Sequence, residues 1–127
     1  MKIVNLLFWL LAFGLFSVSY AQSSDTASLL FFPAQFDLGD LHEIDTVTKD
    51  IRVENHANHP IVLADVLTTC GCTALSVPES PIGPGESTQL TISFDAHDAI
   101  GYQRKVVQVI DDQGKHYKII FTANVLP

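Results

Sequence analysis

The alternation of apolar and polar residues in two stretches of the chain constrains its fold more than any other feature. Between Leu90 and Asp95 every second side chain is apolar, and Tyr117 begins a similar series that ends at Val125. A period of two residues is that of a β-strand with one face in a core, because successive strand side chains point to opposite faces. No window after residue 21 shows a sustained helical period, so the sequence predicts an all-β domain.

Further short strands are predicted between turn-forming residues. The segment 46–55 alternates, and 106–110 is apolar on both faces, as a central strand of a sandwich can be. Two short apolar pieces, 29–32 and 36–38, flank Pro33, which suits an edge strand that bends or changes its partner. The inward-facing positions of these strands predict a core of Val47, Ile51, Val53, Leu63, Leu90, Ile92, Phe94, Val107, Val109, Ile119 and Phe121.

The turns agree with this pattern. The segment 111–114 lies between two strand patterns, and a type I turn with Gly114 in the left-handed region would close a hairpin there. The run containing Gly83, Pro84 and Gly85 cannot be helix or central strand, and predicts a turn that leads into the Leu90 strand. Strands about ten residues apart with such turns are typical of an antiparallel β-sandwich.

The first 21 residues have the pattern of a signal peptide. Lys2 gives a positive start, residues 3–18 are almost all apolar, and the tripeptide ending at Ala21 has the small-x-small form that signal peptidase cuts. The alternative is a membrane anchor, but the run is short for a span and no basic residue follows it. We expect a helical signal peptide cleaved after Ala21, with no stable membrane span afterwards, and a periplasmic or secreted protein.

The expected mature chain is one domain. Residues 22–28 are polar and predicted to be disordered, and 29–127 are predicted to form the sandwich. Loss of Lys2 leaves six Lys and Arg residues against 14 Asp and Glu residues, a net charge of −8. This balance repels phosphates, so we expect no nucleic acid partner.

Several segments together resemble a known family. They are Phe36-Asp37-Leu38-Gly39, a strand ending in Asn55, Pro60-Ile61, Thr69-Cys70-Gly71-Cys72-Thr73, Ile82-Gly83-Pro84-Gly85-Glu86 and a closing strand from Gly101. Their order resembles the bacterial DUF1573 family from about Leu30 to Val125. The resemblance implies an exported immunoglobulin-like sandwich, similar to sperm-protein and cilia-associated domains, without an established role. The family usually has a glycine in the turn after Asn55, and here we expect Asn58 to take a positive φ.

Cys70 and Cys72 are the two cysteines of the chain, separated by Gly71. Residues i and i+2 of a regular strand are about 7 Å apart at Cα, at the upper limit for a disulfide. A disulfide therefore needs a bend, which we expect Gly71 to supply through φ values closed to other residues.

Three interpretations of Cys70-Gly71-Cys72-Thr73 stay open. The pair is structural, as a tight disulfide or as two small side chains at a strand kink; or it exchanges disulfides; or it binds zinc or copper with histidines. Nothing else in the sequence requires a metal, a cofactor or a catalytic residue, since hydrolase, phosphate-binding and zinc-protease motifs are absent. We therefore predict a non-enzymatic module that binds unknown envelope proteins through exposed strand edges, with a thiol-redox or metal-binding protein as the alternative.

Overall fold

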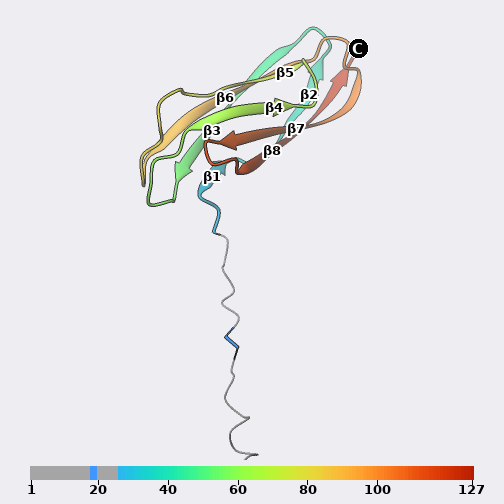
Figure 1. The fold of residues 1–127 in the computed structure, drawn as a ribbon. Helices are drawn as coiled ribbons and strands as arrows, with labels where there is room; N and C mark the ends of the chain where they lie inside the picture. Colours follow the sequence, from blue (N-terminus) through green and yellow to red (C-terminus); the bar gives the residue numbers. More distant parts are fainter. Residues whose placement is uncertain (1–17, 20–25) are drawn as a thin grey trace, which may run out of the picture.

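The computed structural model describes residues 18–19 and 26–127. This part of the chain forms strands and no helix, so it contains no helix long and apolar enough to cross a membrane (Figure 1). Most of the predicted signal peptide, and residues 22–25 of the predicted disordered segment, lie outside the described residues. The strands are β1 (Leu29–Phe32), β2 (Gln35–His42), β3 (Thr46–Asn55), β4 (Leu63–Thr68), β5 (Thr73–Ser76), β6 (Ser87–Asp95), β7 (Gly101–Asp111) and β8 (His116–Leu126).

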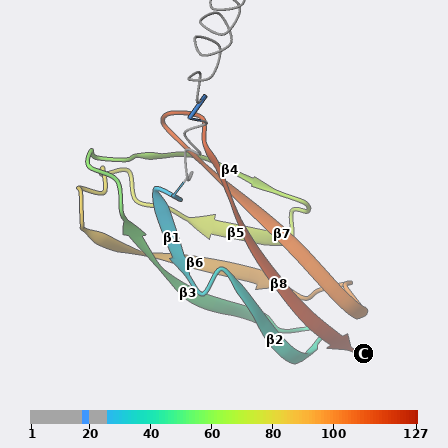
Figure 2. The ribbon, with the colours of Figure 1, turned by 90° about the horizontal axis from the view of Figure 1, so that it is seen from below.

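The strands form two sheets that pack face to face (Figure 2). Sheet A has the order β1-β3-β6-β5 and sheet B the order β2-β8-β7-β4. The predicted immunoglobulin-like β-sandwich is therefore confirmed. One pairing differs from the purely antiparallel expectation, because β2 runs parallel to β8.

The parallel pairing follows from the change of partner that was predicted at Pro33. β1 pairs with β3 in sheet A, and after Pro33 the chain continues as β2 beside β8 in sheet B. Because the chain changes sheet without reversing, the direction of β2 is already set by β1. Pro33 has no N–H to leave unpaired at this crossing, which is why a proline is tolerated between two edge strands.

The core lies between the sheets. Besides predicted residues it contains nine described residues that were not predicted, namely Leu29, Phe31, Leu41, Ile61, Ile82, Ala96, Tyr117, Ala123 and Val125. Every predicted core residue is buried except Val47. That residue is at the start of β3 and is only partly buried, although it still packs against the core. Phe94 of β6 and Phe121 of β8 meet across the sandwich with ring centroids 5.4 Å apart, and Phe36 of β2 stacks on Phe121 at 5.6 Å. These three rings connect the two sheets through the centre of the molecule.

The β7–β8 hairpin has the predicted left-handed glycine, since Gly114 has a φ of 80°. Its turn is also organised by Asp111, a buried carboxylate that the sequence analysis treated only as a turn residue. One oxygen of Asp111 accepts hydrogen bonds from the backbone N–H groups of Gln113 and Lys115, at 2.9 and 2.8 Å. The other accepts from the hydroxyl of the buried Tyr117 at 3.1 Å. The hairpin end is thereby joined to the core.

Candidate functional site

The Cys70–Cys72 pair forms a disulfide in the turn between β4 and β5. The two Cα atoms are 5.3 Å apart, well inside the range that a disulfide tolerates. The expected bend is therefore present. Because β4 belongs to sheet B and β5 to sheet A, the disulfide closes the turn by which the chain passes from one sheet to the other.

The bend does not use the special freedom of glycine. Gly71 is absent from the positive-φ residues, and a Cβ atom placed on it would meet no atom within 4 Å. The expectation that Gly71 supplies a φ closed to other residues is therefore wrong. Instead, hydrogen bonds hold the turn, since the Thr68 hydroxyl donates to the Cys70 carbonyl at 3.1 Å and the Asp95 N–H to the Cys72 carbonyl at 2.8 Å.

Thr73 completes the motif from the first position of β5. Its side chain is buried, and its hydroxyl lies 3.7 Å from the Cys70 sulfur and 3.8 Å from the Cys72 sulfur. Both sulfurs are bonded to each other, so neither is a free thiolate that could attack a disulfide or bind a metal. Within residues 18–19 and 26–127, no three His, Cys, Asp or Glu side chains gather closely enough to hold a metal ion.

The second predicted motif, Gly83-Pro84-Gly85, forms the turn before β6. The Glu86 N–H donates to the Gly83 carbonyl at 3.0 Å, and the Glu86 carboxylate accepts from the Gly83 N–H at 2.9 Å. Gly85 has a φ of 72°, where other residues are strained. This turn lies at the opposite end of β6 from the disulfide, so the two predicted motifs do not form one site.

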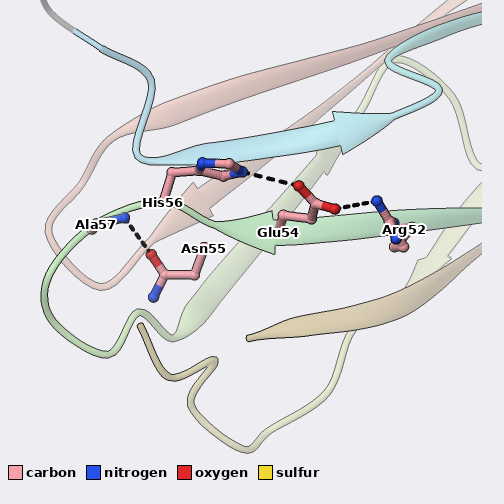
Figure 3. Close-up of polar contacts among 5 residues, drawn as sticks. All are labelled: Arg52, Glu54, Asn55, His56 and Ala57. Carbon is pink, nitrogen blue, oxygen red and sulfur yellow. Dashed lines mark hydrogen bonds and ion pairs between the residues drawn. The ribbon is translucent and has the colours of Figure 1, made fainter. Parts of the chain in front are cut away.

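Asn55 connects this turn to the β3–β4 connection, a role that its place at the end of an alternating segment does not predict. Its side-chain amide nitrogen donates to the carbonyls of His59 and Ile82, at 2.9 and 2.8 Å. Its amide oxygen accepts from the Ala57 N–H at 2.8 Å (Figure 3). The Asn55 side chain is buried and its hydrogen-bonding groups are paired. The turn is stabilised in this way, and the expected positive φ at Asn58 is not observed.

A row of charged side chains lies beside Asn55 on the outer side of β3. The His56 ring is 2.9 Å from one Glu54 oxygen, and Arg52 pairs with the other (Figure 3). The hydrogen bond from His56, followed by the charge of Arg52, holds the pKa of Glu54 below its ordinary value. A shallow, open pocket of about 380 Å³ lies next to Glu54, Asn55 and His56. Of the residues that line this pocket, Asn55 is engaged in structural hydrogen bonds, and Glu54 and His56 are paired with each other.

The first half of β7 has an edge that is open to a partner. Residues 46–51 of β3 are also paired on one side only, with β6, because β1 reaches no further than Arg52. Residues 101–110 pair with β8 without interruption, but on the other side β4 ends at Thr68, opposite Val107. Residues 101–106 therefore have a strand partner on one side only within the described structure, and Figure 2 shows β7 continuing past the end of β4. The β4 chain is turned away at this point by the disulfide turn, which directs it into β5 of sheet A.

The four outermost strands are poorer templates for an added strand. β1 and β5 have only four residues each. β2 and β4 are longer, but each has a register shift, between Asp37 and Asp40 and between Leu63 and Asp65. Short or bulged edge strands disfavour pairing with another chain. By contrast, the open stretch of β7 pairs with β8 without a register shift, and Tyr102 within it is 71% exposed.

Comparisons with solved structures agree with the sandwich fold. A protein of unknown function from Porphyromonas gingivalis W83 has a TM-score of 0.66 and 21% identity, over 82% of this chain and 51% of that one. This chain thus spans about half of that protein. The ASH / PapD-like domain 7 of human CEP192 has a TM-score of 0.62 and 12% identity, over 87% and 96% of the chains. WR4, a C. elegans MSP family member, has a TM-score of 0.54 and 8% identity, over 80% and 100%.

At these identities the comparisons show the fold alone. A search of curated proteins finds no match. The family model described as "Protein of unknown function (DUF1573)" matches residues 29–125, a range that contains both predicted motifs and every strand except the end of β8. The chain therefore belongs to the DUF1573 family.

Proposed function

We propose that this protein is an exported, non-enzymatic interaction module that binds an extended segment of another envelope protein at the open edge of β7. The observation that carries the proposal is the one-sided pairing of residues 101–106. An unpaired strand edge presents alternating N–H and C=O groups, and an extended peptide satisfies them by adding itself as a strand.

The location of this edge supports the proposal. A partner strand would continue the line of β4 beyond Thr68, on the side of β7 that the disulfide turn leaves open. The turn is fixed by the disulfide and by the hydrogen bond from Asp95, so the free edge does not depend on a mobile loop being displaced. Binding to a preformed edge avoids much of the entropy cost of ordering the receptor.

Export is part of the proposal and rests on the leader pattern of residues 1–21, with cleavage after Ala21. Residues 22–28 then precede the sandwich of 29–127. A disulfide is also more compatible with the periplasm or the exterior than with a reducing cytoplasm. Protein purified from the native compartment should begin at Gln22; a chain that retains Met1 there would contradict the export step.

Amide hydrogen exchange tests the binding step directly. In the free protein, about every second amide of 101–106 should exchange fast, because it faces no strand, whereas amides of 107–111 should be protected on both sides. Peptides selected from a random library against the purified protein should slow exchange in 101–106. The proposal is wrong if selected peptides protect other residues instead, or if repeated selections give no binder.

A further inference from the structure

The side chains around the open edge of β7 indicate which segment would fit there. Val107 and Val109 point into the core, so Gln103 and Lys105 share their inner face. Tyr102 and Arg104 therefore point to the outer face of sheet B, together with Val106. An added strand would place one of its own side chains beside each of these five residues.

Charge is the most distinctive property of this stretch. Arg104 and Lys105 are the only adjacent pair of Lys and Arg residues in a chain with 14 Asp and Glu residues. Neither forms an ion pair with any described residue, whereas Arg52 is paired with Glu54. Lys105 is also partly buried. Two cations thus lie on opposite faces of the open edge, both available to carboxylates of an added strand.

The residues that flank the two cations are suited to apolar contacts. Tyr102 is highly exposed, and Val106 is partly buried on the outer face. Aromatic and β-branched side chains form favourable cross-strand pairs with apolar neighbours. A strand beside residues 102–106 therefore gains most with an apolar residue at each end and acidic residues at the two positions between them that face Arg104 and Lys105.

We infer that the segment bound at β7 is an extended peptide with two consecutive acidic residues between flanking apolar ones. In the antiparallel direction, which continues that of β4, the matching sequence is Val-Glu-Glu-Thr-Tyr. This inference rests on the proposed strand addition and adds the chemistry of the partner. It requires no change of the sandwich, because the cations and the edge are already in place.

A competing role for the same cations is protective. Charged side chains on an open edge also prevent two copies of a protein from pairing edge to edge. The two roles differ in what neutral replacements do. If Arg104 and Lys105 only protect the edge, the double variant Arg104→Gln/Lys105→Gln should self-associate, and its affinity for an acidic peptide should equal that of the wild type.

The test uses the purified protein and three capped peptides that contain Val-Glu-Glu-Thr-Tyr, Val-Gln-Gln-Thr-Tyr or Val-Lys-Lys-Thr-Tyr at their centre. Titration followed by nuclear magnetic resonance gives each Kd. We expect the Glu-Glu peptide to bind about tenfold more tightly than the Gln-Gln peptide, a preference that salt should reduce. The Arg104→Glu/Lys105→Glu variant should prefer the Lys-Lys peptide instead.

The matched control is Lys49→Glu/Lys118→Glu, which changes the net charge equally but on exposed residues outside the edge. It should keep the wild-type preference. Equal binding of Glu-Glu and Gln-Gln peptides, with protection of 101–106, would overturn this inference and leave strand addition intact. Binding that the control abolishes as strongly as the edge variant would mean that only net charge matters. Self-association of the wild type through β7, measured by sedimentation, would make a second copy the occupant and would also overturn the inference.

Discussion

Single residues at the Asn55 end of the sandwich hold two connections in place. The Asn55 amide is a donor to two carbonyls and an acceptor from one N–H. A single side chain thus supplies hydrogen bonds to both connections. A carboxylate or an apolar residue of similar size could not serve both functions. Asparagine at the end of a strand is therefore a structural requirement here, although sequence alone shows it only as the last residue of an alternating segment.

Asn55→Ala should lower the free energy of unfolding by at least about 2 kcal/mol, because the buried Ile82 carbonyl, the partly buried His59 carbonyl and the partly buried Ala57 N–H each lose a hydrogen-bond partner. Urea denaturation of the variant measures the loss. Asn58→Ala, at an exposed neighbouring position, is the matched control and should change stability by less than about 0.5 kcal/mol. Equal effects of the two changes would show that the Asn55 network is not important for stability.

Glu54 gives a prediction for pH dependence. The neighbouring His56 and Arg52 hold the pKa of folded Glu54 below its ordinary value, so its stabilising contribution is present above the unfolded pKa, at about 4.3. That contribution should be lost as the pH falls through the lower, folded pKa. Unfolding measured from neutral to acidic pH should show a shallower decline for Glu54→Gln than for the wild type. Glu79→Gln, at an exposed position elsewhere, should keep the wild-type slope.

At the scale of elements, the disulfide turn determines where the chain leaves sheet B, at the end of β4, and enters sheet A as β5. The closed ring contains only three residues, so its loop-closure contribution is small, about 1.5 kcal/mol. Its position matters more than this energy, because the turn ends β4 while β7 continues. Cys-x-Cys spacing alone is compatible with a structural disulfide, with disulfide exchange and with metal binding, so the sequence leaves all three open.

Replacing both cysteines by serine should lower stability by about 1 to 3 kcal/mol, from lost burial and ring closure, while the fold is kept. Denaturation of the double variant and of the reduced wild type should give similar losses. Gly71→Ala is the control within the same turn, and should have little effect because the site has open space and an ordinary φ. A double variant that does not fold would contradict this estimate.

The sequence predicts where most strands lie, but it mostly does not predict which strands pair with each other in a sheet. The boundaries of β3 agree with the alternating segment 46–55, because one face of this strand is buried along much of its length. The change of partner at Pro33 was also predictable, since proline interrupts a ladder. The open edge of β7 was not, because it depends on where β4 stops in space and on no residue within β7 itself.

At the scale of the whole molecule, the sandwich is joined through its aromatic centre. Phe94 is fully buried and meets Phe121 of the other sheet, so it contributes both buried area and a contact between sheets. Phe94→Ala should cost about 3 to 5 kcal/mol, a large part of the stability of a small domain. Phe32→Ala is the control, since Phe32 is 45% exposed. A loss at Phe94 below about 1 kcal/mol would contradict its place in the core.

The sequence predicted the fold well because each strand has its own local pattern of apolar and polar residues. The inward-facing core positions follow from that alternation. It predicted the candidate site less well, since hydrogen bonds such as those of Asn55 and Asp111 join residues whose side chains meet only after folding. Function is even harder to predict from local sequence patterns. The residues that carry our proposals, Tyr102, Arg104 and Lys105, belong to no recognised motif, and their environment gives them significance.

The division of the N-terminal strand between the two sheets has an engineering consequence. Residues 29–42 supply one outermost strand to each sheet, and they are joined to the rest of the sandwich by a single short turn before β3. Cut between residues 42 and 43, the domain should behave as two parts: this segment, and a remainder that lacks one outermost strand in each sheet. Supplied as a separate peptide, the segment should restore the domain only by taking both strand positions at once, so the two parts would serve as a two-part reporter of proximity.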